Sequence, residues 1–128
     1  MDTKCEYCNP ELRSDQQVLL SNMTCLFLQL KNQEIKGSGI IVSREHKETV
    51  FDLNPEEWEG TFELLQEAKK YIDENYQPEG YNVGWNCGHV GGQHIMHAHM
   101  HVIPRYADEP MAGKGIRFLF KSDENKRK

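Results

Sequence analysis

Three histidines at alternate positions, His97, His99 and His101, are the strongest constraint in this sequence. Apolar residues separate them, and the alternation extends over residues 95–103. Side chains at positions i and i+2 lie on the same face of a β-strand, so the pattern predicts a strand with three imidazoles on one face. Each buried imidazole needs a hydrogen-bond partner or a metal ion. The pattern therefore indicates a functional site rather than ordinary core packing.

The clearest helix signal covers residues 55–76. Asn54 can cap the first turn, Pro55 suits the first helical position, and acidic residues follow at the positive end of the helix dipole. Apolar residues then recur every three or four positions, which predicts one core-facing stripe. The predicted stripe consists of Trp58, Phe62, Leu65, Ala68, Ile72 and Tyr76.

Short apolar stretches predict strands on both sides of this helix, which is typical of an α+β fold. The first two form a predicted hairpin, and residues 31–38 are a predicted loop. The predicted strands are residues 17–21, 24–29, 39–43, 81–86, 95–103 and 116–120.

A chain of 128 residues is typical of one domain, which we place at residues 1–121, followed by a charged, flexible tail at residues 122–128. The net charge of −5 argues against a nucleic-acid polymer as partner, because such proteins carry a basic surface. No apolar stretch approaches the ~20 residues of a membrane span, and the N-terminus lacks a signal-peptide pattern. These features predict a cytoplasmic protein with four reduced cysteines.

A glycine-rich stretch precedes the histidines. Gly91 and Gly92 would let the backbone approach an anion closely, and Gln93 could donate a side-chain hydrogen bond. Neutral imidazole is both a nucleophile and a proton carrier. A phosphoryl or acyl group is therefore the expected electrophile.

Cys5 and Cys8 form a C-x-x-C pair. This spacing indicates half of a zinc site or a redox pair, and two surface thiols are the third interpretation. A redox pair usually lies in a thioredoxin-like setting, which the extreme N-terminus does not supply. A zinc site needs two further ligands. Cys25 and Cys87 lie in apolar or strand-like contexts and are predicted to be inert.

Residues 97–103 resemble the His-φ-His-φ-His-φ-φ signature of the histidine triad (HIT) superfamily, where φ is apolar. Residues 80–86, Gly92-Gln93 and 104–106 extend the resemblance to its bacterial Hint-like branch. The resemblance implies a HIT-like α+β fold with about five antiparallel strands, one long helix and short helices, paired into a homodimer. It also implies a nucleotide or a nucleotide conjugate as the ligand.

The resemblance further implies a catalytic triad of His97, His99 and His101, with His99 as the nucleophile. His99 would attack the α-phosphorus of a nucleoside phosphoramidate or dinucleoside polyphosphate, and water would release the mononucleotide from the covalent nucleotidyl-histidine. His101 at the third position favours hydrolysis over nucleotidyl transfer. The implied phosphate- and nucleotide-binding residues are Asn86, Gly92, Gln93, His94 and His101, and the implied structural zinc ligands are Cys5, Cys8, His46 and His97.

The chain departs from the family pattern around the substrate. Ser38 replaces a histidine that supports the triad, and residues 28–32 lack the acidic residue that usually contacts the ribose. His94 stands where Ser or Thr usually contacts the leaving group, so it could protonate that group, bind a phosphate or lie on the rim. The resemblance therefore predicts the reaction type rather than the substrate. The alternatives are a non-enzymatic nucleotide-binding HIT module and a zinc module for protein interaction.

Overall fold

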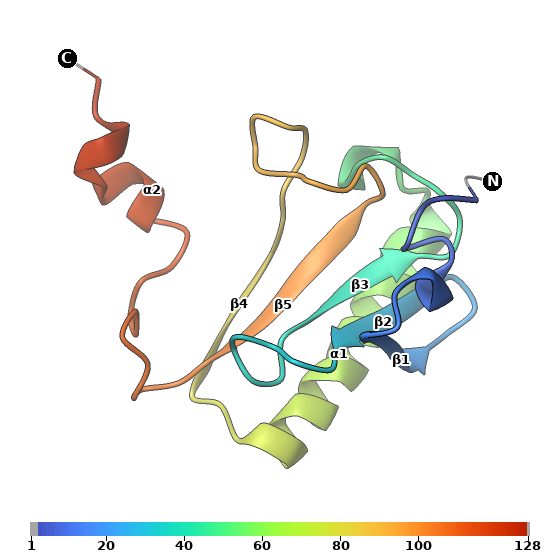
Figure 1. Ribbon diagram of the computed structural model, residues 1–128, viewed down its shortest axis with the longest axis horizontal. Coiled ribbons are helices and arrows are strands. Elements are labelled where there is room, and N and C mark those ends of the chain that lie inside the picture. The colour runs from blue at the N-terminus through green and yellow to red at the C-terminus, as the bar shows by residue number, and fades with distance from the viewer. Residues whose placement is uncertain (1–2, 128) are drawn as a thin grey trace.

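A five-stranded antiparallel sheet forms the centre of the α+β fold (Figure 1). The computed structural model describes residues 3–127. The spatial order is β1-β2-β3-β5-β4, so the strand that carries His99 lies inside the sheet. In chain order the strands are β1 (Gln16–Ser21), β2 (Cys25–Leu30), β3 (Gly39–Ser43), β4 (Gly80–Trp85) and β5 (His99–Arg105).

Four of the six predicted strands are confirmed, and the predicted hairpin is the β1–β2 pair. The strand predicted at residues 95–103 begins only at His99, because residues 95–98 fold into a turn in which His97 N donates to Ile95 O. The strand predicted at residues 116–120 is wrong. Local hydrogen bonds between residues three apart make this segment helical, and it contains α2 (Phe118–Lys121).

Helix α1 (Pro55–Tyr76) has the bounds that the sequence predicts. Its N-terminus is a reciprocal capping box, in which Asn54 accepts from Glu57 N and the Glu57 carboxylate accepts from Asn54 N. α1 packs on one face of the sheet, and its Leu64, Ala68 and Ile72 join the main core. None of the helices within residues 3–127 has the length and apolar character needed to cross a membrane.

The predicted core stripe of α1 is wrong at its first two positions, because Trp58 is 55% exposed and Phe62 is 61% exposed. Gly60 faces the turn between β1 and β2 instead, and a Cβ atom at this position would lie 1.9 Å from Thr24 Oγ1. Because Gly60 lies this close to Thr24, the helix turns its Gly60 side toward the protein and leaves the rings of Trp58 and Phe62 exposed. Trp58 instead stacks on Trp85 of β4, with ring centroids 6.1 Å apart.

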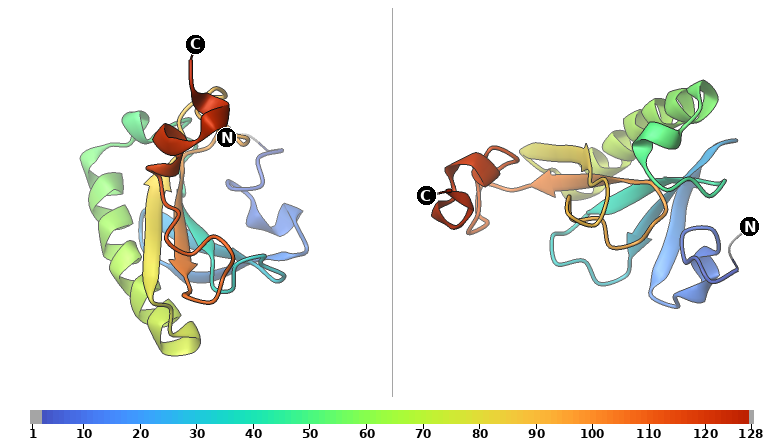
Figure 2. Two further views of the ribbon diagram at one scale, coloured as in Figure 1. Left: turned by 90° about the vertical axis from the view of Figure 1, so that its left-hand side faces the viewer. Right: turned by 90° about the horizontal axis from the view of Figure 1, so that it is seen from above.

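The N-terminal segment covers the opposite face of the sheet (Figure 2). Cys5 and Tyr7 pack there against Leu28 and Val42 in a second, smaller core. The sheet is therefore a middle layer, with α1 on one side and the N-terminal segment on the other. The remaining helical turns are η1 (Pro10–Leu12), η2 (Val50–Asp52) and η3 (Asp123–Asn125).

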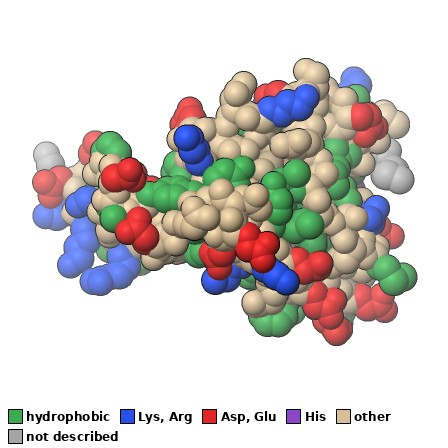
Figure 3. Space-filling model, turned by 90° about the horizontal axis from the view of Figure 1, so that it is seen from below, with side chains coloured by type: hydrophobic (Ala, Val, Ile, Leu, Met, Phe, Trp, Pro, Cys, Tyr) green, Lys and Arg blue, Asp and Glu red, His purple; other side chains and the backbone are tan. Residues whose placement is uncertain are grey.

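The C-terminal segment with α2 and η3 stands away from the sheet (Figure 1). Figure 3 shows its Lys and Arg side chains at the narrow end of the molecule, whereas Asp and Glu side chains gather along the margin of the broad part. The predicted tail at residues 122–128 contains η3, and its flexibility stays a prediction. Residues 1–2 of the predicted domain and residue 128 of the tail lie outside the described residues.

Candidate active site and metal centre

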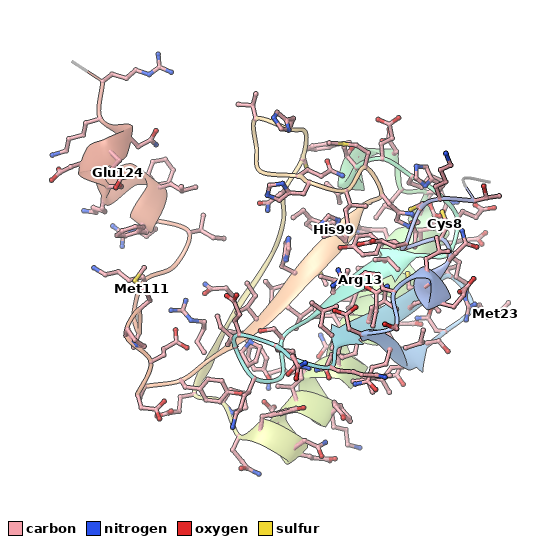
Figure 4. All side chains as sticks on the ribbon, in the orientation of Figure 1. Cys8, Arg13, Met23, His99, Met111 and Glu124 are labelled. Carbon is pink, nitrogen blue, oxygen red and sulfur yellow. The ribbon has the colours of Figure 1, made fainter. Side chains whose placement is uncertain are left out.

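His99 is the first residue of β5 and lies on the face covered by the N-terminal segment, near Cys8 and Arg13 in Figure 4. Its Nδ1 atom is 2.8 Å from the carbonyl oxygen of His97. A carbonyl oxygen can only accept a hydrogen bond, so Nδ1 carries the ring proton and Nε2 keeps its lone pair. The structure thus gives His99 the tautomer that a nucleophilic imidazole requires.

His101 follows on the same face, with its ring centroid 5.0 Å from that of His99. Its Nε2 atom is buried and has no hydrogen-bond partner within residues 3–127, and the same holds for Ser38 Oγ. Ser38 is the residue at which the resemblance implies a histidine that supports the triad. The substitution therefore coincides with an unpartnered ring nitrogen on the third histidine of the triad.

Burial is the main influence on the three histidines, and it lowers the pKa of His97, His99 and His101. The hydrogen bond to the His97 carbonyl opposes this effect at His99, and the charge of His94 adds to it. The neutral form of His99, which is the nucleophilic form, is thus favoured. The exposed His94 lies close enough to His99 for this influence.

Cys5, Cys8, His46 and His97 form a candidate metal centre. Their donor atoms all lie within 4.8 Å of one another. His97 Nδ1 is 3.4 Å from each sulfur, and His46 Nδ1 is 3.2 Å from Cys8 Sγ. Ligand bonds of the usual zinc lengths at tetrahedral angles give a nitrogen–sulfur separation of about 3.5 Å. The four side chains therefore fit a tetrahedral zinc ion.

The tautomer of His97 also fits a metal. Its Nε2 atom is 2.7 Å from Ser43 O and must donate to it, which leaves the Nδ1 lone pair directed toward the two sulfurs. The ring is fully buried. The structure thus brings together all four of the zinc ligands implied by the sequence.

The glycine-rich loop follows β4 and leads to the turn before β5. Gly88 and Gly92 adopt φ angles of +77° and +98°, which favour glycine. The side chain of Asn86 lies beside Gly92. Exposed residues Asn86, Gly92 and His94 can therefore present polar groups to a ligand.

Gln93 occupies a different environment from the one expected, since only 1% of it is exposed. Its Oε1 accepts from Gly88 N at 2.8 Å, and its Nε2 donates to Glu48 O at 2.6 Å and to Ile95 O at 3.0 Å. Both amide hydrogens are thus already used within the protein. Gln93 anchors the loop, and its amide has no further hydrogen to donate to a phosphate.

A cavity of about 460 Å³ opens beside the triad. Its floor is apolar, and a polar rim follows the N-terminal segment and the β2–β3 loop. The volume lies within the range of small-molecule pockets. The floor and wall include Tyr7, Leu28, Leu30, Ile40, His101 and Ile103, and the rim includes Arg13, Gln16, Asn32, Gln33 and Glu34.

Sequence reasoning missed Tyr7. Its ring lies edge-on to those of His97 and His99, at centroid distances of 5.9 and 5.0 Å, and it also lines the cavity. An aromatic residue inside a metal-binding C-x-x-C was the available signal, because ligation of Cys5 and Cys8 would fix whatever lies between them.

A family model described as the HIT domain matches residues 11–108, which is well over half of the chain. The chain is 32% identical over 87 residues to protein hit of Bacillus subtilis, covering 68% of this chain and 56% of that protein. It is 31% identical over 80 residues to adenosine 5′-monophosphoramidase hnt1 of Schizosaccharomyces pombe, covering 62% and 57%. The chain thus spans a little over half the length of these two relatives. A crystal structure of a HIT family protein from Bacillus anthracis matches with a TM-score of 0.78 at 25% identity, covering 100% of this chain and 89% of that one.

Proposed function

The chain belongs to the HIT family, and we propose that it is a nucleotide hydrolase acting on a nucleoside phosphoramidate or a dinucleoside polyphosphate. The observation that carries the proposal is the hydrogen bond from His99 Nδ1 to His97 O, which leaves Nε2 unprotonated on a ring that contacts Tyr7 and His101, both of which line the cavity. The name of the S. pombe relative, an adenosine 5′-monophosphoramidase, supports this reaction class.

The proposed reaction has two displacement steps. His99 Nε2 attacks the α-phosphorus and forms an N–P bond, while the bond from phosphorus to the leaving group breaks and the leaving group takes the electron pair and a proton. Water then attacks the same phosphorus and gives up one proton to His94, which lost its own in the first step. The N–P bond breaks with its electron pair returning to His99 Nε2, and the nucleoside monophosphate departs. Covalent catalysis of this kind divides one difficult displacement into two easier ones.

Polar groups around His99 would assist these steps. We assign His101, Asn86 and the backbone at Gly92 to contact the phosphate oxygens, where negative charge develops. His94 is the exposed imidazole near the nucleophile, and we assign it to protonate the leaving group. Gln93 contributes indirectly, since its three hydrogen bonds hold the loop that carries these groups.

We propose that Cys5, Cys8, His46 and His97 hold a structural zinc ion. Four protein ligands leave no open position, so zinc would supply cross-linking rather than Lewis-acid chemistry. His97 would then act on the reaction only through its carbonyl group, which orients the ring of His99.

The test is AMP release from adenosine 5′-phosphoramidate, diadenosine triphosphate and diadenosine tetraphosphate by the zinc-loaded protein. His99→Asn should lose at least ~10³-fold in rate on the preferred substrate while keeping its melting temperature. His89→Asn is the matched control, because His89 is an exposed loop histidine with no assigned role. Undiminished AMP release by His99→Asn contradicts the proposal. AMP binding without hydrolysis by the wild type would indicate the alternative, a non-enzymatic binding module.

We also propose that the protein is a homodimer, with an interface formed by α1 and β4. β4 is an edge strand, and Val83 on it is 39% exposed. Trp58 and Phe62 expose most of their surface on the neighbouring part of α1, and with Leu65 and Met100 they line an apolar hollow. A contiguous apolar surface of this kind is typical of a protein interface.

A further inference from the structure

Tyr7 is in contact with both the candidate metal centre and the proposed nucleophile. It lies between Cys5 and Cys8, is only 8% exposed, and places its ring edge-on against those of His97 and His99. The same side chain forms part of the cavity wall together with His101. One ring therefore touches a metal ligand, the nucleophile and the ligand pocket.

We propose that Tyr7 is a positioning residue that couples metal occupancy to nucleotide affinity. Ligation of Cys5 and Cys8 would fix the segment on both sides of Tyr7, which keeps its ring against His99 and keeps the cavity wall in place. Loss of the metal would release both ends of this short segment, and the cavity would lose that wall. The inference rests on the proposed function, since it takes the cavity to be the nucleotide pocket.

The ring, rather than the hydroxyl group, makes the described contacts. Within residues 3–127 the Tyr7 hydroxyl makes no hydrogen bond, whereas the ring makes two aromatic contacts. Tyr7→Phe should therefore preserve the coupling, and Tyr7→Leu should remove it. The hydrogen bond between His97 O and His99 Nδ1 does not involve Tyr7, so it stays intact in both variants.

Coupling between two binding sites is reciprocal, so a nucleotide that binds more tightly to the metal-loaded protein must also stabilise the bound metal. This reciprocity supplies a measurement that does not depend on turnover. The zinc affinity can be measured at equilibrium by competition with a coloured chelator, with and without AMP, and AMP affinity can be measured on the zinc-loaded protein by calorimetry.

AMP should raise the zinc affinity by about tenfold in the wild type and in Tyr7→Phe, and by less than about twofold in Tyr7→Leu. Tyr7→Leu should also bind AMP about tenfold more weakly, by the same coupling. Tyr71→Leu is the matched control, because Tyr71 is a half-buried tyrosine of α1 packed against the core on the other face of the sheet. It should behave as the wild type does.

Two results would overturn the inference. One is AMP binding to the wild type with no effect on zinc affinity, and this result needs no variant, so it holds even if Tyr7→Leu fails to fold. The other is wild-type behaviour of a folded Tyr7→Leu in both measurements. Failure of the wild type to bind AMP at all is a separate result, which overturns the proposed function together with the coupling.

Discussion

Replacement of Gln93 by leucine should destabilise the fold, and any loss of activity should result from this destabilisation. Gln93 is 1% exposed and makes three hydrogen bonds, with Gly88 N, Glu48 O and Ile95 O. Leucine has a similar volume but loses all three bonds, and it leaves Gly88 N and Glu48 O without these partners, whereas Ile95 O keeps its bond from His97 N. At about 1 kcal/mol for each bond, the expected loss in the free energy of unfolding is about 3 kcal/mol. For a domain of this size that corresponds to a fall of roughly 10–15 °C in melting temperature.

The assay is thermal and urea unfolding of the wild type, Gln93→Leu and the control Gln66→Leu. Gln66 is exposed on α1, so its replacement should change stability by less than about 0.5 kcal/mol. The reasoning is refuted if Gln93→Leu melts within about 1 °C of the wild type but loses most of its kcat/KM. That result would mean that the amide turns toward the substrate and serves as the phosphate donor expected from the sequence.

Three further perturbations test other parts of the structure. Cys8→Ser should reduce the zinc content, measured by mass spectrometry, from about one ion per chain to nearly none, whereas Cys25→Ser should keep it. Phe62→Glu should convert a dimer into a monomer in light scattering, because it places a charge on the apolar surface of α1; an unchanged mass would contradict the proposed interface. Arg105 forms an ion pair with Glu109 and lowers the pKa of that carboxyl group in the folded protein. The ion pair therefore stabilises the protein at a pH above the ordinary carboxyl pKa of about 4.3. This stabilisation is lost as the pH falls through the lower pKa of the folded state. Glu109→Gln should therefore reduce the melting temperature at pH 7 but not at about pH 2, and an equal difference at both would refute this linkage.

Secondary-structure elements whose ends are set by neighbouring residues could be predicted from the sequence. The bounds of α1 follow from Asn54, Pro55 and the residues that stop it, all of which act within one turn of the helix. The face that α1 buries could not be predicted in the same way. It depends on the contact between Gly60 and Thr24, which are far apart in the chain, and a helical wheel contains no information about that contact.

In the candidate site too, features that depend on neighbouring residues could be predicted, and features that depend on distant residues could not. The residue types that carry chemistry were predictable, because alternate histidines and a C-x-x-C are patterns within a few residues. The role of Gln93 was not, since its partners include the carbonyl group of Glu48, 45 positions away. Backbone carbonyl groups are present at every residue, so the sequence does not mark the ones that a side chain will contact.

Segment 46–48 shows how such carbonyl groups tie the site together. His46 is a candidate metal ligand, Lys47 O accepts from Ala98 N, and Glu48 O accepts from Gln93. Three consecutive residues thus hold the metal centre, the approach to β5 and the glycine-rich loop in one arrangement. A metal bound to His46 would therefore restrain the loop as well as the N-terminal segment.

The late start of β5 has a chemical consequence. In a regular strand the carbonyl group of residue i lies in the plane of the sheet and pairs with a neighbouring strand, so it could not reach a side chain at i+2 on the same chain. Because residues 95–98 form a turn, the His97 carbonyl is directed at the ring of His99 instead. Three polar groups of His97 then have separate roles near the site. Nδ1 faces the two sulfurs, Nε2 donates to the carbonyl oxygen of Ser43, and the carbonyl oxygen of His97 sets the tautomer of His99. The departure from the predicted strand is thus what allows one histidine to serve both the candidate metal centre and the proposed nucleophile.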